Sequence, residues 1–554
     1  MLTPLAAFLT AVQQQPNKPY LRQPRNGVYH DYSWAKVAEM AKSMAFQLRK
    51  LGIQPGDKVA IWSKNCAEWI ISDLAIMMAG GVSVPLYPGQ SKANVHYVLK
   101  HSEAKILFVG KHDDDNHVID AIPENFPTIG FNFYSGPSHY SWDTLVEQSV
   151  PADFSIHEPK LDEVMTLVYT SGTTGQPKGA VHTYGSYGFA ANNAVETIGL
   201  GTHDRAISFL PLAHVAERVI IQGQSYYAWF TISFAESVDT FGDNLASVQP
   251  TLFFAVPRLW SKFQEGILNK VGGQKKLSRL LSIPIIGGLV KRKIQKGLGL
   301  YHCNLCGCGA SPMPKALIDW FETIGIQIVE GYGMTENMCY GTFNFPQDRQ
   351  VGSVGKPFHQ NTVKISEEGE ILFKSKALMQ GYYKEPEKTE EALKDGFYHT
   401  GDKGFIDEQG FLHITGRVKE LFKTSKGKYI APAALESLLT THTFIEQACV
   451  MGSGRNQPLA VIELSETARA TDKSKVEQEI TDHLAHVNRQ VEHHERMDCI
   501  VITQLTWTVE SDLITPTLKI RRDTVEGRYE SLAKEGQAIV WGPKEVNQDA
   551  HQAA

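Results

Sequence analysis

The first two-thirds of the chain alternate between short apolar runs and helix-length amphipathic stretches. Residues 34–51 and 66–78 carry apolar side chains at helical spacing, whereas Lys58-Val-Ala-Ile-Trp62 between them is apolar and rich in strand formers. Similar strand-like runs recur further along the chain, at residues 105–109, 206–210 and 251–256. This alternation predicts an α/β fold in which helices cover largely parallel sheets.

The pattern changes near residue 352 to short strands separated by glycine turns. Apolar and polar side chains alternate in three short segments, residues 369–373, 404–407 and 410–414. We therefore expect a small antiparallel subdomain over about 352–415. It would close a large N-terminal domain formed by residues 1–415.

The remaining residues, 416–554, predict a smaller α+β domain. Residues 473–491 have the spacing of an amphipathic helix, and Cys499-Ile-Val-Ile-Thr503 is typical of a strand. The tail after about residue 542 has no apolar period, so we expect it to be frayed.

Composition and charge limit the classes of protein that remain. Of the 554 residues, 42% are hydrophobic and 21% are charged, which supplies large cores and excludes wholesale disorder. The 54 Lys and Arg against 60 Asp and Glu give a net charge of −6, which argues against a dedicated nucleic-acid-binding protein. Seven cysteines form no disulfide framework, which favours a reducing, cytoplasmic location. The most apolar window, residues 69–87, contains Asp73, Gly80, Gly81 and Pro85, so no bilayer-spanning segment is predicted.

A glycine-rich segment, Leu167-Val-Tyr-Thr-Ser-Gly-Thr-Thr-Gly-Gln-Pro-Lys-Gly-Ala180, follows a strand-like entry. Glycines let backbone N–H groups approach an anion, hydroxyls donate further hydrogen bonds, and a lysine adds positive charge. The candidate phosphate-binding residues are Thr170, Ser171, Gly172, Thr173, Thr174, Gly175 and Lys178. An ordinary glycine-rich turn is the alternative. A Walker loop is excluded, because Pro177 and Gly179 stand where that loop needs Gly and Ser or Thr.

Taken whole, this segment resembles the signature of the adenylate-forming (AMP-binding) superfamily. Four further motifs follow in that superfamily's order, namely Gly331-Tyr-Gly-Met-Thr-Glu336, Tyr398-His-Thr-Gly-Asp402, Gly416-Arg417 and Thr515-Pro-Thr-Leu-Lys-Ile520. The resemblance implies a large nucleotide-binding domain followed by a small domain that rotates between reaction steps, with the hinge at Gly416-Arg417. Many relatives have Asp-Arg at this hinge. Glycine permits easy backbone rotation, but any role of the usual carboxylate is absent here.

The resemblance implies a role for each motif in nucleotide binding. Tyr332, between Gly331 and Gly333, would offer its ring to adenine, and Thr335 would place a hydroxyl near the α-phosphate. Glu336, with Thr170, would hold a phosphate-bridged Mg²⁺, a hard cation that prefers oxygen ligands.

Three further motifs are implied to act near the ribose and the α-phosphate. Asp402 would accept hydrogen bonds from the ribose hydroxyls, and Arg417 would add positive charge nearby. Lys519 would contact the substrate carboxylate and the α-phosphate during adenylation. Taken alone, such a glutamate or lysine is usually solvated, and a Gly-Asp pair is usually a turn.

Within the superfamily, the chain most resembles the long-chain fatty acyl-CoA synthetases. The similar stretches are Phe209-Leu-Pro-Leu-Ala-His-Val-Ala-Glu-Arg218, Val256-Pro-Arg-Leu-Trp260, Gln350-Val-Gly-Ser-Val-Gly-Lys-Pro357, Asp395-Gly-Phe-Tyr-His-Thr-Gly-Asp402 and Lys426-Gly-Lys-Tyr-Ile-Ala-Pro432. The resemblance implies that His214 faces the carboxylate region and that Trp260 lines or gates an acyl tunnel. Isolated residues of these types are more often structural, so core packing of Trp260 is the alternative.

The implied activity is a ligase that uses ATP, a fatty acid and CoA. The acid would become acyl-AMP with release of pyrophosphate, and CoA would then displace AMP. A ligase that delivers the acyl group to a carrier protein, a CoA ligase for another carboxylic acid, and a non-catalytic nucleotide or lipid sensor are the alternatives. A sensor would have no need to retain both Glu336 and Lys519.

Two segments fall outside these motifs. Cys303, Cys306 and Cys308 lie close together, but no fourth ligand follows at zinc-like spacing, so we do not expect a metal site. Residues 262–296 combine many lysines and arginines with apolar runs. This combination is typical of a peripheral segment on the inner, anionic face of a membrane, and equally of a solvated insertion.

Overall fold

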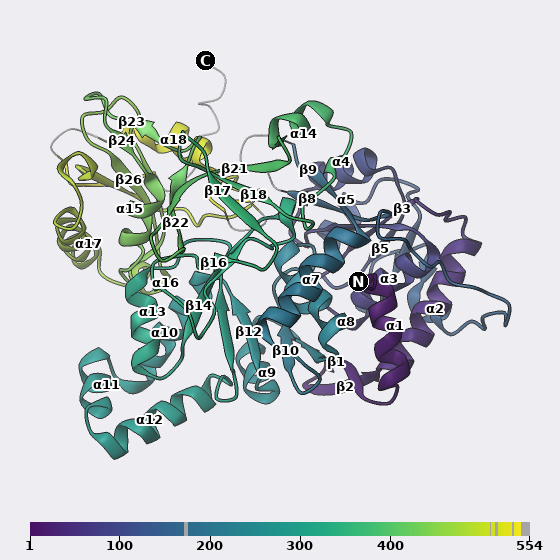
Figure 1. The fold of residues 1–554 in the computed structure, drawn as a ribbon. Helices are drawn as coiled ribbons and strands as arrows, with labels where there is room; N and C mark the ends of the chain where they lie inside the picture. Colours follow the sequence, from purple (N-terminus) through teal and green to yellow (C-terminus); the bar gives the residue numbers. More distant parts are fainter. Residues whose placement is uncertain (171–175, 510, 516–518, 534–536, 544–554) are drawn as a thin grey trace.

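The computed structural model describes residues 1–170, 176–509, 511–515, 519–533 and 537–543. Two large sheets form the body of the molecule (Figure 1). Within the described residues, one sheet has eight strands in the order β19-β9-β8-β4-β3-β5-β6-β7 and the other has nine in the order β16-β15-β14-β13-β12-β10-β11-β1-β2. Most neighbouring strands in the interior of both sheets are parallel, as in an α/β protein, and the predicted fold class is confirmed.

The strands of the first sheet are β3 (Lys58–Trp62), β4 (Val82–Leu86), β5 (Ala104–Val109), β6 (Thr128–Gly130), β7 (Tyr140–Ser141), β8 (Val164–Thr170), β9 (Lys178–Thr183) and β19 (Gly381–Tyr382). Those of the second are β1 (Pro19–Arg25), β2 (Val28–Ser33), β10 (Arg205–Ser208), β11 (Thr231–Phe234), β12 (Leu252–Ala255), β13 (Leu305–Cys308), β14 (Ile328–Tyr332), β15 (Thr342–Phe343) and β16 (Lys356–Pro357). The strands predicted at 58–62, 105–109, 206–210 and 251–256 are therefore confirmed to within two residues.

Helix α3 (Ala67–Ala79) lies between the two sheets and is buried along its whole length. It touches β3 and β4 of one sheet and β1 of the other. Its two acidic residues are paired, because Asp73 accepts a 2.7 Å hydrogen bond from buried Arg218 and Glu68 accepts a 2.8 Å bond from Arg25. A buried carboxylate needs such partners. Helix α3 thus joins the two sheets into one core.

The other helices of this part lie along the chain before and between the strands of the two sheets. They are α1 (Pro4–Gln14), α2 (Trp34–Lys50), α4 (Lys92–Ser102), α5 (Asp115–Ala121), α6 (Trp142–Val146), α7 (Tyr184–Ile198), α8 (Gln224–Ala228), α9 (Phe241–Val248), α10 (Pro257–Val271), α11 (Gln274–Leu281), α12 (Pro284–Gly297) and α13 (Lys315–Thr323). The helices predicted at 34–51 and 66–78 are confirmed as α2 and α3. None of the described helices combines the length and apolar character needed to span a bilayer.

A third, antiparallel sheet follows, as predicted. It contains β17 (Thr362–Ile365), β18 (Glu370–Lys374), β20 (Leu393–Lys394), β21 (Phe397–Ile406) and β22 (Leu412–Arg417), with α14 (Pro386–Ala392) beside it. The hinge expected at Gly416-Arg417 lies at the end of β22, where Arg417 pairs with Asp402 of β21.

The last part of the chain forms a four-stranded sheet in the order β25-β26-β27-β28 (upper left of Figure 1). Its elements are β25 (Ile445–Met451), β26 (Leu459–Leu464), β27 (Cys499–Thr503), β28 (Ile539–Trp541), α15 (Pro432–Leu439), α16 (Glu466–Arg469), α17 (Lys473–Asn488) and α18 (Arg522–Tyr529), preceded by the short hairpin β23 (Phe422–Lys423) and β24 (Tyr429–Ile430). The predicted helix 473–491 and strand 499–503 are confirmed. Of the tail expected to be frayed, residues 544–554 lie outside the described part of the chain.

Candidate active site

The candidate residues gather where the strands of the nine-stranded sheet end. Strands β10, β12, β13 and β14 are parallel, so their carboxyl ends lie at one edge. His214 follows β10, and Tyr332 and Thr335 follow or end β14. Open parallel sheets bind ligands at this edge, because the loops there converge.

The phosphate-loop candidates lie at the turn of the β8–β9 hairpin. Thr170, the last residue of β8, is paired with Lys178, the first residue of β9. The hairpin therefore holds both side chains at the mouth of the loop. Ser171, Gly172, Thr173, Thr174 and Gly175 lie outside the described residues.

Glu336 lies in a short 3₁₀ turn, Thr335–Asn337, directly after β14. Its side chain is buried, and the phenol of Tyr382 donates a 2.7 Å hydrogen bond to Oε1. Its backbone C=O accepts from the N–H of Met379, which fixes the turn against the chain that leads into β19. The carboxylate is thus held at one oxygen, and within the described residues no hydrogen bond is made to Oε2.

Glu336 fits the donor set that Mg²⁺ prefers. Magnesium is usually bound by one or two carboxylates together with substrate phosphates, and not by a cage of protein ligands. Within the described part of the chain, no cluster of three or more His, Cys, Asp or Glu side chains is arranged to hold a metal. A metal at Glu336 would therefore depend on oxygens supplied by the nucleotide.

The turn before Glu336 leaves no room for side chains. A Cβ at Gly333 would come within 2.5 Å of the backbone Cα of Cys339, and one at Gly331 would meet the ring of Phe343 at 3.1 Å. Glycine at 333 therefore lets the chain fold back on itself directly after Tyr332. His182 on β9 supports the same turn, since its Nε2 lies 2.8 Å from the backbone oxygen of Thr335.

Asp402 lies between Tyr332 and Arg417. The hydroxyl of Tyr332 donates a 2.6 Å hydrogen bond to Oδ2, and Nε of Arg417 donates a 2.9 Å bond to Oδ1. Each carboxylate oxygen can accept a second hydrogen bond, so both remain able to bind a hydroxyl. The ring of Tyr332 packs against Phe373 with 5.5 Å between centroids, which limits its rotation.

Lys519 enters the same region from the last part of the chain. Its side chain interacts electrostatically with Arg417, Glu336 and Asp402. Part of its surface is exposed, but the surrounding protein removes bulk water, and this desolvation, reinforced by Arg417, lowers the pKa of the ammonium. Residues 183 positions apart in the sequence thus lie within electrostatic range of each other.

His214 also lies within electrostatic range of Lys519. Burial, with a smaller contribution from the Lys519 charge, lowers the pKa of His214 to about 4. Its Nδ1 accepts a 3.1 Å hydrogen bond from the N–H of Ala216, so the proton of the neutral ring lies on Nε2. His214 can therefore donate a hydrogen bond to an oxygen in the cleft.

The loop that carries His214 is fixed by residues that sequence reasoning missed. Asn65 accepts a 3.0 Å hydrogen bond from the N–H of Leu212, and its amide donates to the backbone oxygen of Leu210. Oε1 of Glu217 accepts a 2.6 Å bond from the hydroxyl of Ser208, and burial raises the pKa of Glu217 to about 8. No spacing in the sequence links Asn65 to this loop, whereas Glu217 stands inside the quoted motif.

Trp260 is completely buried in α10. Its ring meets those of Phe253, Phe263 and Phe321 at centroid distances of 5.5, 5.9 and 5.1 Å. The tunnel role expected for Trp260 stays a prediction. The cysteines at 306 and 308 are buried on β13, and the thiol of Cys303 lies 3.3 Å from the backbone oxygen of Leu305.

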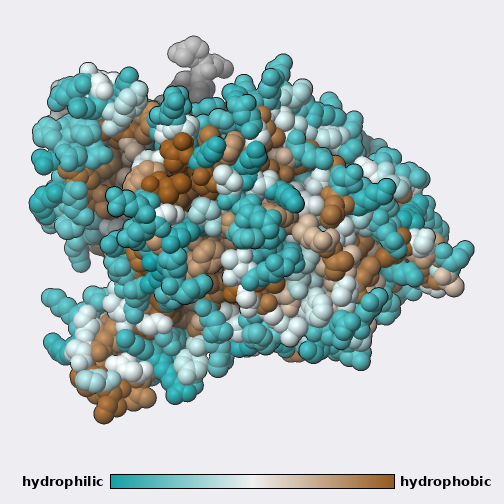
Figure 2. All heavy atoms as spheres, in the orientation of Figure 1, coloured by the Kyte–Doolittle hydropathy of each residue, from teal (hydrophilic) through white to brown (hydrophobic). Residues whose placement is uncertain are grey.

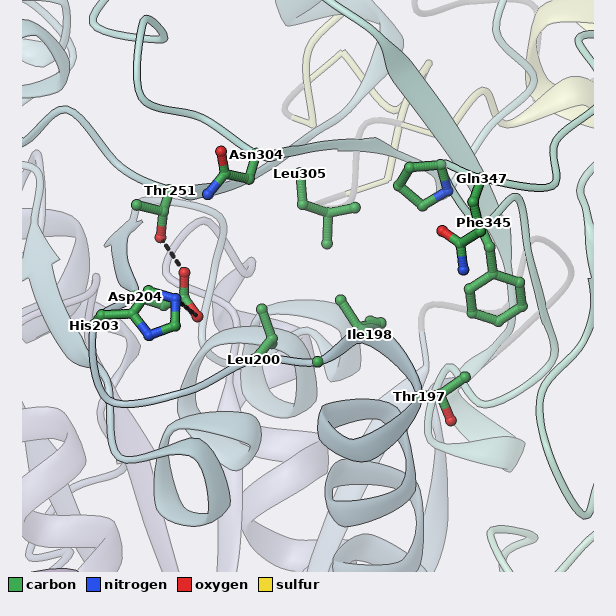
Figure 3. A pocket seen from close by; sticks show the side chains of 12 residues that line it. Thr197, Ile198, Leu200, His203, Asp204, Thr251, Asn304, Leu305, Phe345 and Gln347 are labelled. Carbon is green, nitrogen blue, oxygen red and sulfur yellow. Dashed lines mark hydrogen bonds and ion pairs between the residues drawn. The ribbon is translucent and has the colours of Figure 1, made fainter.

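A cavity of about 150 Å³ lies at the opposite edge of the same sheet (Figure 3). Asp204, Thr251 and Asn304 in its wall precede β10, β12 and β13, so it faces the amino ends of these strands. The hydroxyl of Thr251 donates a 2.7 Å hydrogen bond to Asp204, as drawn in Figure 3. None of the candidate nucleotide residues lines this cavity, so it is separate from the site described above.

Comparison with known protein families identifies the family of the chain. Residues 8–383 match the family model of the AMP-binding enzymes, and residues 420–535 match that of the AMP-binding enzyme C-terminal domain. The chain belongs to the AMP-binding enzyme family. The family identified from the motifs is therefore confirmed.

Curated relatives of this AMP-binding enzyme match along nearly its whole length. The long-chain-fatty-acid–CoA ligase FadD15 of Mycobacterium tuberculosis is 31% identical, covering 91% of this chain and 92% of the relative. The peroxisomal long chain acyl-CoA synthetase 7 of Arabidopsis thaliana is 29% identical, covering 95% of this chain and 85% of the relative.

Solved structures show the same fold. The adenylation domain of a carboxylate reductase from Mycobacterium chelonae has a TM-score of 0.80 at 22% identity, covering 96% of this chain and 90% of that chain. The anthranilate CoA ligase AuaEII, solved with anthranoyl-AMP, has a TM-score of 0.77 at 22% identity, covering 95% and 96%. At 22% identity, this similarity establishes the fold of the present chain and does not establish its substrate.

Proposed function

We propose that this AMP-binding enzyme activates a long-chain fatty acid with ATP and transfers the acyl group to CoA. The observation that carries the proposal is that Lys519 lies within electrostatic range of both Glu336 and Asp402. A lysine, a carboxylate suited to Mg²⁺ and a carboxylate suited to a ribose are the groups that adenylation of an acid requires. The names of the relatives, long-chain fatty acid ligases, support the choice of acid and of CoA.

In the first step, a carboxylate oxygen of the fatty acid attacks the α-phosphorus of ATP, and pyrophosphate leaves. Two anionic groups must approach each other, so the ammonium of Lys519 lowers the barrier by neutralising charge where it accumulates. His214 donates from Nε2 to the substrate carboxylate, and Thr335 places its hydroxyl near the α-phosphate. Glu336 with Thr170 would hold Mg²⁺, which would neutralise charge on the phosphates.

The other candidate residues position the nucleotide. Thr170, Lys178 and the loop 171–175 would surround the β- and γ-phosphates with N–H, hydroxyl and ammonium donors. Tyr332, with Gly331 and Gly333 beside it, would lie against the adenine, and Asp402 with Arg417 would bind the ribose and neighbouring phosphate. Catalysis is then mainly positioning and electrostatic stabilisation.

In the second step, the thiol of CoA attacks the acyl carbon of acyl-AMP, and AMP leaves. AMP is a better leaving group than the oxygen of a free carboxylate. We propose that residues 416–554 form a mobile domain that turns at Gly416-Arg417 between the two steps. Gly416 has φ of +152°, a backbone conformation that residues with side chains rarely adopt. A change of conformation at this residue would carry Lys519 away and open a path for the thiol.

Product analysis tests the proposal directly. The full chain is incubated with ATP, Mg²⁺, CoA and a series of fatty acids, and AMP and acyl-CoA are measured by chromatography. We expect adjacent long chain lengths all to react, because one methylene in an apolar pocket discriminates only about 10–200-fold. If acetate or an aromatic acid were by far the best substrate, the assignment of a long-chain fatty acid would be wrong. The proposed role of Trp260 as a gate to an acyl tunnel would then be wrong as well.

The acceptor is tested in the same assay. Release of AMP should depend on CoA, and acyl-AMP should accumulate when CoA is left out. If AMP release did not depend on CoA and required a carrier protein, the enzyme would be an acyl-AMP ligase instead.

We also propose that the enzyme works in the cytoplasm and touches membranes only peripherally, through residues 262–296. A long-chain acid partitions into lipid, so contact with a membrane would bring the enzyme to its substrate. The excess of basic residues and the exposed apolar side chains in this segment support the contact.

A further inference from the structure

Helices α11 and α12 form a hairpin at one end of the molecule (lower left of Figure 1). Its exposed apolar residues form a patch at the hairpin's outer end, seen in brown in Figure 2. The exposed fractions are 43% for Ile283, 81% for Ile285, 42% for Ile286 and 64% for Leu289. Single exposed apolar residues are common, but four within seven positions of one turn and helix form a surface that water solvates poorly.

The exposed side of α12 has an apolar half and a basic half. Ile285, Leu289, Arg292 and Lys296 are spaced by four, three and four residues, so they follow one side of the helix, with Lys293 beside them. All five are exposed. The apolar residues come first and the cations follow, so one end of the helix is suited to lipid tails and the other to phosphates.

The opposite side of the hairpin is fixed to the protein. Gly287 is buried, and a Cβ there would come within 2.6 Å of the backbone oxygen of Leu281, so the two helices touch closely. The amide of Gln295 donates a 2.9 Å hydrogen bond to the backbone oxygen of Ile324, and Ile294 packs on the core of the neighbouring sheet. The patch is therefore held outward by a packed support.

The charge of the hairpin is strongly one-sided. Residues 266–297 contain no Asp or Glu and eight cations, namely Lys270, Lys275, Lys276, Arg279, Lys291, Arg292, Lys293 and Lys296. In the described part of the chain, none of these eight forms an ion pair. Arg292 and Lys296 lie over the ring of Tyr301 at 5.1 and 5.2 Å, which leaves their charge uncompensated. The rest of the protein carries the excess of acidic residues, so this field is local.

We propose that the α11–α12 hairpin docks on an anionic lipid bilayer, with Ile285 and Leu289 below the headgroups and Arg292, Lys293 and Lys296 at the lipid phosphates. Along the exposed side of α12, apolar side chains are followed by cations. This order matches a bilayer surface, where the apolar acyl chains lie below the charged headgroup phosphates. A second copy of the same face is a poorer partner, because two such surfaces would bring like charges together. The proposed function supplies the reason for lipid contact, but the docking surface does not depend on it.

Sedimentation with vesicles tests the surface. The full chain is mixed with vesicles of phosphatidylcholine alone and of phosphatidylcholine with phosphatidylglycerol, at low and at high salt. We expect binding to the anionic vesicles at low salt and release at high salt, since exposed charges are screened beyond about 10 Å at 0.1 M. Equal binding to both vesicles, or binding to neither, would overturn the proposal.

Two variants separate the charged and apolar contributions. Arg292→Gln with Lys293→Gln and Lys296→Gln should weaken anionic binding by at least about tenfold, because each surface cation contributes roughly fivefold. Ile285→Ser with Leu289→Ser should weaken binding at both salt concentrations, because that contribution is not ionic. All five residues are exposed, so these variants should fold as the parent does.

Matched control variants make the result specific. Lys50→Gln with Lys92→Gln and Lys100→Gln removes three exposed charges elsewhere, and Val28→Ser with Val238→Ser removes two exposed apolar side chains. Both controls should bind like the parent, and any loss equal to that of the hairpin variants would overturn the assignment. A parent dimer that the hairpin variants convert to a monomer would instead assign the surface to a second copy.

Activity on a fatty acid supplied without vesicles distinguishes this proposal from the proposed function. The hairpin variants should retain that activity while losing vesicle binding. If the parent showed no ligase activity but still bound vesicles, the proposed function would be wrong and the proposed docking surface would still be supported.

Discussion

Tyr382 links Glu336 to Lys178. Its hydroxyl donates a 2.7 Å hydrogen bond to Oε1 of Glu336, and the ammonium of Lys178 lies over its ring, 5.0 Å from the centroid. Backbone pairing of β19 with β9 fixes Tyr382 beside the phosphate-loop hairpin. One side chain thus positions a candidate metal ligand and a candidate phosphate ligand relative to each other.

Removing this hydroxyl should loosen Glu336, whereas the ring beneath Lys178 is kept. For Tyr382→Phe we expect a weaker apparent affinity for Mg²⁺ and ATP, by roughly tenfold, because the lost bond joins a hydroxyl to a carboxylate. Isothermal titration of the full chain with MgATP measures this without turnover. Tyr383→Phe is the control, since its hydroxyl bonds exposed Glu103 instead. Unchanged binding in Tyr382→Phe would show that Glu336 needs no such support.

Lys519 should act in one half-reaction only. Removing a preorganised electrostatic donor commonly costs about 10²–10³ in rate, so Lys519→Ala should lose acyl-AMP formation from ATP by that factor. Thioester formation from supplied acyl-AMP and CoA should stay near normal, because the lysine has turned away by then. Rapid-quench assays of each half-reaction measure both rates.

Arg521→Ala is the matched control, because Arg521 pairs with Asp512 and does not enter the cleft. Equal loss in both half-reactions of Lys519→Ala would contradict domain alternation. Full ATP-dependent activity would remove Lys519 from the site.

The positive φ of Gly416 should be needed for the conformation in which adenylation proceeds. The Cβ that Gly416→Val adds would make only ordinary contact, 3.4 Å from Cβ of Ala431, so the cost of this atom comes from the φ of +152° and not from a clash. Such strain costs on the order of 1–3 kcal/mol. We expect adenylation to slow by tenfold or more and thioester formation to change less, measured with the same half-reaction assays.

Gly527→Ala serves as the comparison for Gly416→Val. Gly527 lies within helix α18, and nothing stands within 4 Å of a Cβ there. It should leave both rates unchanged. If Gly416→Val behaved likewise, the conformation seen at 416 would not be the one used in adenylation.

Glu217 should make the stability of the protein fall as pH rises. Burial raises its pKa to about 8 from an ordinary value of 4.5, so the folded state keeps a proton that the unfolded state releases. The stabilisation is fully present below pH 4.5 and is lost as pH rises to about 8. Glu217→Gln keeps the acceptor at Oε1 without a titrating group, so it should gain about 2–4 °C in Tm relative to the parent between pH 5.5 and pH 8.5.

Differential scanning calorimetry across this pH range measures the difference. Glu408→Gln, at an exposed position, should follow the parent at every pH. A Glu217→Gln curve parallel to that of the parent would mean that Glu217 is already ionised in the folded protein.

The amino-acid sequence by itself determined the fold class, the positions of the main elements and the family. Runs such as 58–62 and 499–503 are strands because their residues favour a buried extended chain, and this preference is local. The motif residues Tyr332, Glu336, Asp402 and Lys519 are equally local signals, since each stands in a short pattern of fixed spacing. The basic and apolar composition of residues 262–296 is also visible without a structure.

Only the tertiary structure decided which of these residues meet. Asn65 reaches the His214 loop, and Tyr382 reaches Glu336, across sheet and loop contacts that join distant segments. Composition placed cations and isoleucines together in α12, but helix packing decided that Ile285 and Leu289 face outward while Ile294 faces the core. Local propensity depends on neighbours in sequence, whereas burial, pKa and side-chain partnership depend on neighbours in space, and chain topology alone brings those together.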